Sequence, residues 1–124
     1  MSRLYLLNAF SLSMIPYQGW VHLYIKQVDA EEARRIFEDA VLKDKEIISA
    51  IGHESSAKIM SELLGREVPA RRIQVTLEDG DEALVLQLMI RPPEGKVLSY
   101  EELQQLLKEG KIKLFHIQLS TKFW

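Results

Sequence analysis

Residues 71–90, RRIQVTLEDGDEALVLQLMI, form the stretch that decides the expected fold. Two runs of β-favouring residues, RRIQVTL and EALVLQLMI, are separated by Glu-Asp-Gly-Asp. An Asp-Gly pair between two such runs is a strong local signal for a β-hairpin, because tight two-residue turns need positive φ angles that these residues tolerate. The stretch therefore predicts two antiparallel strands joined by a tight turn.

The hairpin also predicts which side chains share a face. If Asp79 and Gly80 form the loop, Arg72 lies directly across from Gln87. Strand alternation places Arg91 on that same face. The opposite face, expected in the core, carries Leu84, Leu86, Leu88 and Ile90. Two arginines and a glutamine on one face indicate a polar site, and the alternative is that these arginines are ordinary solvated strand residues.

The rest of the chain alternates between strand and helix patterns. Strands are expected over residues 3–10, 20–27, 46–51 and 111–119, the first two in hairpin-like order. Helices are expected over about residues 30–42 after an N-cap at Asp29, over the segment that Gly65 ends, and after the Ser99 to Glu102 capping box. This order predicts a single α/β domain over residues 1–124, with a mixed β-sheet of about five to six strands and flanking helices.

Composition and charge limit the possible functions. The 124 residues are 47% hydrophobic and 27% charged, which is typical of one globular domain. Cysteine is absent, which excludes thiolate nucleophiles and cysteine-based zinc or iron–sulfur sites. The first residues have the pattern of a strand rather than of a signal peptide or membrane span, so we expect a cytoplasmic protein without membrane association. A net charge of −2 argues against binding long nucleic acid but leaves a small anionic ligand open.

His53 is the strongest candidate for chemistry. It lies in the run GHESS, where a strand is expected to stop and a helix to begin, and such strand ends bind ligands in open α/β sheets. The N-terminal amides of the helix and two serine hydroxyls would then face an anion. The alternative is that Ser55 or Ser56 merely caps the helix and that Gly52 permits the turn.

Several common signatures are missing. The sequence has no Gly-rich phosphate loop followed by Lys-Ser or Lys-Thr, no dinucleotide-binding fingerprint and no paired metal-ligand histidines. His22 and His116 are interpreted as sheet-surface residues, since the pattern gives neither of them a neighbouring acid or cation. Any catalysis is therefore expected to proceed without a metal or another cofactor.

Four ordered blocks are specific enough to indicate a family: LNAFS at 7–11, AIGHES at 50–55, GDEAL at 80–84 and EGKVL at 94–98. The chain resembles the viral anti-CRISPR ring nucleases, formerly a domain of unknown function, from about residue 3 to residue 117. The resemblance implies a homodimeric α/β enzyme that degrades cyclic tetra-adenylate, the second messenger of type III CRISPR systems, and so suppresses that defence. For a viral protein, it implies activity in the host cytoplasm.

The resemblance also assigns roles to individual residues. His53 is implied as the catalytic acid and Glu94 as the residue that assists it, although Pro92 and Pro93 depart from the family pattern and could alter the loop that places Glu94. Ligand contacts are implied at Asn8, Ser11, Ser55, Ser56, Arg72, Gln87 and Arg91. The expected reaction is metal-independent cleavage to linear di-adenylate with a 2′,3′-cyclic phosphate, by attack of a ribose 2′-hydroxyl. The alternative is a non-catalytic module that binds a cyclic nucleotide or a viral or host protein partner.

Overall fold

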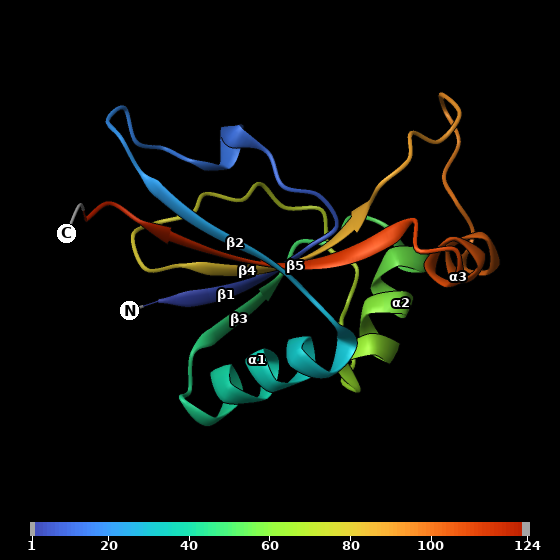
Figure 1. Ribbon diagram of the computed structural model, residues 1–124, viewed down its shortest axis with the longest axis horizontal. Helices are drawn as coiled ribbons and strands as arrows, with labels where there is room; N and C mark the ends of the chain where they lie inside the picture. Colours follow the sequence, from blue (N-terminus) through green and yellow to red (C-terminus); the bar gives the residue numbers. More distant parts are fainter. Residues whose placement is uncertain (1, 123–124) are drawn as a thin grey trace.

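A five-stranded mixed sheet organises the computed structural model, which describes residues 2–122 (Figure 1). The strands are β1 (Arg3–Leu7), β2 (His22–Val28), β3 (Glu46–Ser49), β4 (Glu82–Leu88) and β5 (Ile112–Ser120). The helices are α1 (Ala30–Leu42), α2 (Glu54–Leu64) and α3 (Tyr100–Lys108), with a short 3-10 helix, η1 (Leu12–Met14). The strand order is β2-β5-β4-β1-β3, in which β1 is parallel to β3 and β4, and β5 is antiparallel to β4 and β2. The predicted α/β fold class is confirmed.

The helices begin and end where local sequence signals predict. The Asp29 carboxylate accepts a hydrogen bond of 2.8 Å from the Glu32 amide and caps α1. Ser99 and Glu102 form the predicted capping box of α3. Gly65 ends α2 in the left-handed conformation, with φ of 70°, which costs glycine little.

The two faces of the sheet are covered by different kinds of structure. The three helices pack against one face, called here the helix face, which contains Leu84 and Leu86 of β4 (Figure 1). The other face, called the open face, is covered by residues 8–21 and 71–79, which contribute Val75 and Leu77 to a second core around Val85. Both faces of β4 are therefore buried, which explains its continuous apolar sequence.

The predicted hairpin of residues 71–90 is wrong. β4 pairs with β1 along one edge and with β5 along the other, so no edge remains for residues 71–77. These residues instead begin beside the segment that follows β3, where the Arg71 amide donates to the Ile51 carbonyl at 2.8 Å. From there they cross the open face of the sheet. The register that places Arg72 opposite Gln87 is therefore wrong as well.

Two other sequence expectations need correction. The first two strands do not form a hairpin, because β4 and β5 lie between β1 and β2 in the sheet. Ile90 was expected in the core with Leu84, Leu86 and Leu88, but it is 39% exposed because β4 ends at Leu88. The Asp-Gly turn does form, with φ of 87° at Gly80, and it connects the crossing segment to β4.

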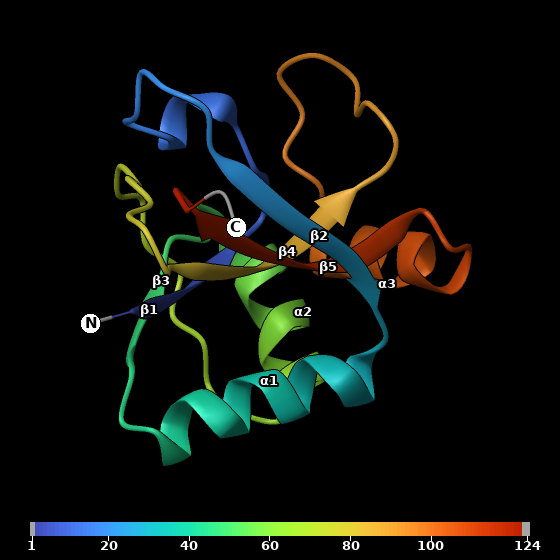
Figure 2. The same ribbon diagram turned by 60° about the vertical axis from the view of Figure 1, so that its left-hand side comes forward.

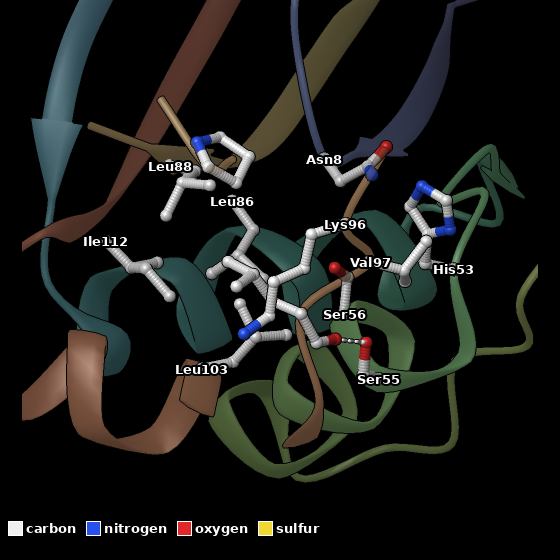
Figure 3. Close-up of a pocket in the computed structure, with 12 residues that line it drawn as sticks. Asn8, His53, Ser55, Ser56, Leu86, Leu88, Lys96, Val97, Leu103 and Ile112 are labelled. Atoms are coloured by element: carbon white, nitrogen blue, oxygen red, sulfur yellow. Dashed lines mark hydrogen bonds between the residues drawn. The ribbon is translucent and has the colours of Figure 1, made fainter. Parts of the chain in front are cut away.

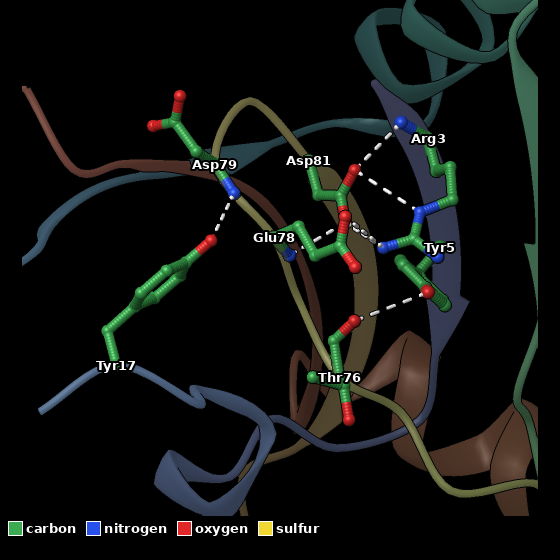
Figure 4. A network of polar contacts seen from close by, with 7 residues as sticks. All are labelled: Arg3, Tyr5, Tyr17, Thr76, Glu78, Asp79 and Asp81. Atoms are coloured by element: carbon green, nitrogen blue, oxygen red, sulfur yellow. Dashed lines mark hydrogen bonds and ion pairs between the residues drawn. The ribbon is translucent and has the colours of Figure 1, made fainter. Parts of the chain in front are cut away.

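A buried ion pair holds this turn against the first strand (Figure 4). Asp81 is 1% exposed, and its carboxylate accepts hydrogen bonds from the Arg3 amide at 2.9 Å and the Arg3 guanidinium at 2.7 Å. The same carboxylate accepts the Glu78 amide at 2.8 Å, across the turn. The Asp79 amide donates to the Tyr17 hydroxyl at 2.9 Å, which ties in the other segment on the open face. We call the contacts of Asp81 with Arg3 and Glu78 the Asp81 clasp.

Candidate functional site

The carboxyl ends of the three parallel strands meet at one edge of the sheet. Asn8 follows β1 directly, and residues 50–53 connect β3 to α2. Ligands in open α/β sheets bind outside this edge. A cavity of about 180 Å³ opens here between the helix face, α2, α3 and the loop of residues 89–99 (Figure 3).

The cavity has a polar rim and an apolar floor. Its polar lining residues are Asn8, His53, Ser55, Ser56 and Lys96. Its apolar lining residues are Leu86, Leu88, Pro92, Val97, Leu98, Leu103 and Ile112. Figure 3 shows the Asn8 amide and the His53 imidazole on the same side of this cavity. Four of the residues predicted from sequence, namely Asn8, His53, Ser55 and Ser56, therefore lie together.

His53 is the N-cap residue of α2 but does not act as a side-chain cap. Its backbone is extended, with φ of −130° and ψ of 137°, and its imidazole makes no capping hydrogen bond. The expectation that Ser55 or Ser56 caps the helix is wrong, because both lie within the first turn, and the Ser55 hydroxyl donates to the Leu98 carbonyl at 2.8 Å. The positive end of α2 is thus left without a side-chain cap at the cavity, an arrangement that suits an anion.

Arg72 reaches this edge by a route that the sequence did not indicate. Its Nε donates to the Gly52 carbonyl at 3.1 Å, directly before His53. A Cβ atom on Gly52 would lie 3.4 Å from Arg72 Cγ, which is an ordinary van der Waals contact, so Arg72 packs directly against this position. The neighbour of Arg72 is therefore the link between β3 and α2, and not β4.

The other predicted site residues lie outside the cavity. Ser11 is the N-cap of η1, and its hydroxyl is 3.0 Å from that of Ser13. Gln87 lies on the opposite face of β4 from Leu86 and Leu88, and its amide donates to the Leu88 carbonyl. Arg91 and Glu94 are exposed on the loop of residues 89–99, which projects away from the sheet (Figure 2).

A tight turn in this loop separates two charged residues. The Lys96 amide donates to the Pro93 carbonyl at 3.1 Å, and Gly95 has φ of 77°. A turn with positive φ at its third residue favours glycine there. It leaves Glu94 at the tip, whereas Lys96 returns to line the cavity. Sequence reasoning missed Lys96, because the EGKVL block was read only for Glu94 and for the turn.

Comparison with known proteins identifies the family. The STIV B116-like family matches residues 4–115. The chain belongs to this family.

The similar proteins come from archaeal viruses. The B116-like chain is 38% identical over 104 residues to protein 26 of Sulfolobus islandicus filamentous virus, covering 83% of each chain. It is 34% identical over 117 residues to ORF116 of Acidianus filamentous virus 1, covering 94% of this chain and 96% of that protein. The solved structure of B116 of Sulfolobus turreted icosahedral virus superposes with a TM-score of 0.74 at 32% identity, over 94% of this chain and 99% of that one.

A second polar cluster of the B116-like chain lies at the other end of β4, around Glu82. Its carboxylate contacts His116 Nε2 at 2.8 Å, Lys45 Nζ at 2.7 Å and Gln118 Nε2 at 3.3 Å. The hydrogen bond from His116, followed by the contacts with Lys45, lowers the pKa of Glu82 from 4.5 to about 2. The sequence-based view that His116 has no neighbouring acid is therefore wrong.

Within residues 2–122, no group of three or more His, Cys, Asp or Glu side chains is arranged to hold a metal ion. In the same part of the chain, no helix is long and apolar enough to cross a membrane.

Proposed function

We infer that this B116-like protein is a metal-independent ring nuclease that cleaves cyclic tetra-adenylate and thereby suppresses type III CRISPR defence. The observation that carries the proposal is the position of His53, at the rim of a cavity and beside Asn8 and the first turn of α2. An imidazole there is suited to protonate a leaving oxygen, and the uncapped helix end is suited to hold the phosphate next to it.

The proposed reaction depends mainly on how the protein positions the ring, because the ring carries its own nucleophile. Each ribose 2′-hydroxyl of the ring lies beside the phosphodiester that it attacks. Its oxygen loses its proton to solvent and forms a bond to phosphorus, the bond from phosphorus to the 5′-oxygen breaks, and a 2′,3′-cyclic phosphate and a 5′-hydroxyl result. His53 supplies the proton to the departing 5′-oxygen, a role that contributes typically 10²- to 10⁴-fold to the rate.

The remaining residues bind and orient the ring in this proposal. Asn8, Ser55 and Ser56 offer hydrogen bonds at the cavity rim. Arg72 donates to the Gly52 carbonyl through Nε, so its two terminal guanidinium nitrogens can contact a phosphate. Arg91 contacts a second phosphate, and Gln87 and Ser11 contact the ring from the open face and η1. Glu94 orients His53 once the projecting loop approaches the bound ring.

The size of the cavity favours a homodimer. Small-molecule pockets usually measure roughly 300–1,000 Å³. A cavity of about 180 Å³ accommodates only part of a four-nucleotide ring. A ring of four identical nucleotides has a two-fold axis, and two-fold dimers are the commonest soluble oligomers. Two protomers would each bring one His53 to opposite sides of the ring and cut two phosphodiesters.

One observation favours a second candidate function. Glu94 lies at an exposed loop tip and does not line the cavity that contains His53. A module that sequesters a cyclic nucleotide or a protein partner without cleaving it would not need a glutamate beside His53.

One assay tests both candidates. Labelled cyclic tetra-adenylate is mixed with the protein in EDTA, the products are separated over time, and light scattering gives the oligomeric state. We expect a transient linear tetra-adenylate, then di-adenylate ending in a 2′,3′-cyclic phosphate, from a dimer. Cleavage that requires added divalent metal, or full activity from a monomer, would contradict the proposed mechanism. Stable binding without products would favour the sequestering module, and no binding would reject both candidates.

A further inference from the structure

Lys96 brings a positive charge into the cavity. It is the cationic side chain among the twelve lining residues, all of which belong to the described part of the chain. Figure 3 shows its side chain crossing the cavity from the loop towards Leu103 of α3. The apolar floor lies beneath its aliphatic stem, and the side chain is partly exposed, so its ammonium is accessible to a ligand that enters from solvent.

The present partner of Lys96 does not account for this position. Lys96 Nζ is 2.6 Å from Glu102 Oε2, with side chains that are 46% and 40% exposed. Ion pairs between side chains this exposed contribute little to stability. Glu102 has a separate structural task, because its side chain accepts the Ser99 amide at 3.0 Å in the capping box of α3. The helix start therefore explains Glu102, and the exposed pair with Lys96 adds to it by lowering the pKa of the Glu102 carboxyl to about 2. Because that pair is exposed and weak, the Lys96 ammonium can exchange it for a ligand.

We propose that Lys96 is a further ligand-binding residue, which contacts a phosphodiester of the cyclic oligoadenylate in this cavity. The proposal rests on the proposed function and adds a residue to it. A phosphate that enters the cavity meets Lys96 together with the polar rim residues His53, Ser55 and Ser56, which line the same cavity. The ammonium exchanges its contact with Glu102 for one with the phosphate, or bridges the two. Glu102 then opposes ligand binding, because its negative charge competes for Lys96.

Substitutions of the two partners of the ion pair are expected to change ligand affinity in opposite directions. Affinity for labelled cyclic tetra-adenylate is measured in the His53→Ala background, which prevents turnover during the titration. Lys96→Gln is expected to weaken binding about tenfold, because a charge-assisted contact is lost. Glu102→Gln is expected to strengthen binding about two- to threefold, since it removes the competing charge. Glutamine still serves at the third position of a capping box, so α3 keeps its cap.

Two further variants act as controls. Lys96→Arg retains the positive charge and is expected to bind within about threefold of the parent. Lys43→Gln makes the same charge change at the C-cap of α1, where Lys43 pairs with Asp39 at 3.0 Å, and is expected to bind like the parent. Circular dichroism confirms that each variant is folded.

The outcomes separate the two proposals. If Lys96→Gln and Glu102→Gln weaken binding alike, the ion pair is only structural, and the role of Lys96 as a ligand contact is wrong. Unchanged affinity in Lys96→Gln rejects it too. If the parent protein does not bind the ring at all, both the proposed function and this inference are wrong. That result is distinct from a failure of the Lys96 proposal alone, in which the parent binds and Lys96→Gln binds equally well.

Discussion

His53 lies where β3 gives way to α2, and its side chain is not used to cap the helix. Under the proposed function, His53→Ala removes the proton donor and leaves the phosphate contacts in place. We expect single-turnover cleavage of cyclic tetra-adenylate to fall by at least about 10²-fold, with affinity changed by less than about threefold. Rapid-quench measurements give the rate, and fluorescence titration gives the affinity.

His22→Ala is the matched control, because His22 begins β2 at the opposite end of the sheet from the cavity. Its cleavage rate is expected to equal that of the wild type. Near-normal turnover in His53→Ala would remove His53 from the mechanism, and an equal loss in His22→Ala would show that the effect is not specific to the cavity.

Individual site residues could be predicted where the signal is local in sequence. His53, Ser55 and Ser56 follow a strand pattern directly, so their place at a strand end could be predicted without knowing the sheet order. Arg72 could not be placed in this way, because its neighbour Gly52 is 20 positions away and no local pattern links them. Lys96 was missed because a lysine after a turn glycine is usually a solvated surface residue.

At the scale of elements, the Asp81 clasp fixes where the crossing segment meets β4. Asp81→Asn keeps the shape of the side chain but removes its charge, and it leaves Arg3 without its buried partner. We expect the free energy of unfolding to fall by about 3 kcal/mol, because breaking a buried ion pair from one side is strongly destabilising. Urea denaturation followed by circular dichroism measures the change.

Glu38→Gln provides the comparison for this variant. Glu38 pairs with Arg66 at 2.8 Å, with both side chains about half exposed, so the expected loss of stability is much smaller than for Asp81→Asn. A loss in Asp81→Asn no larger than that in Glu38→Gln would mean that the clasp does not stabilise the fold.

The same elements show why the helices could be predicted and the strand partners could not. The caps at Asp29, Ser99 and Gly65 involve residues within a few positions of each other, so the sequence carries the full signal. The Asp-Gly turn also formed as predicted, but a turn fixes only its own geometry. The neighbours of β4 depend on pairing between distant parts of the chain: β1 occupies one edge of β4 and β5 occupies the other.

At the scale of the whole molecule, the Glu82 cluster couples stability to pH. The pKa of the Glu82 carboxyl is lowered from 4.5 to about 2, so the folded state favours the ionised carboxylate. This stabilisation is complete above pH 4.5 and is lost as the pH falls from 4.5 towards 2. We expect wild type to be more stable than Glu82→Gln by up to about 3 kcal/mol near neutral pH, and the difference to shrink over that acidic range.

Chemical denaturation of both proteins between neutral and acidic pH gives this difference directly. Glu67→Gln, which changes an exposed carboxylate, is the control and should differ from wild type by a nearly constant amount. A difference between wild type and Glu82→Gln that does not vary with pH would show that the contacts with His116 and Lys45 do not stabilise the ionised form.

The interior position of β1, between β4 and β3, has a consequence for synthesis on the ribosome. β1 is the first strand to emerge, yet its two neighbours are β3 and β4, so its pairing is incomplete until residues 82–88 have been made. Residues 4–7 are fully apolar apart from the Tyr5 hydroxyl and are buried only in the finished sheet. Nascent chains that stall before β4 would present an apolar strand with an open edge, which is the kind of surface that aggregates or recruits chaperones.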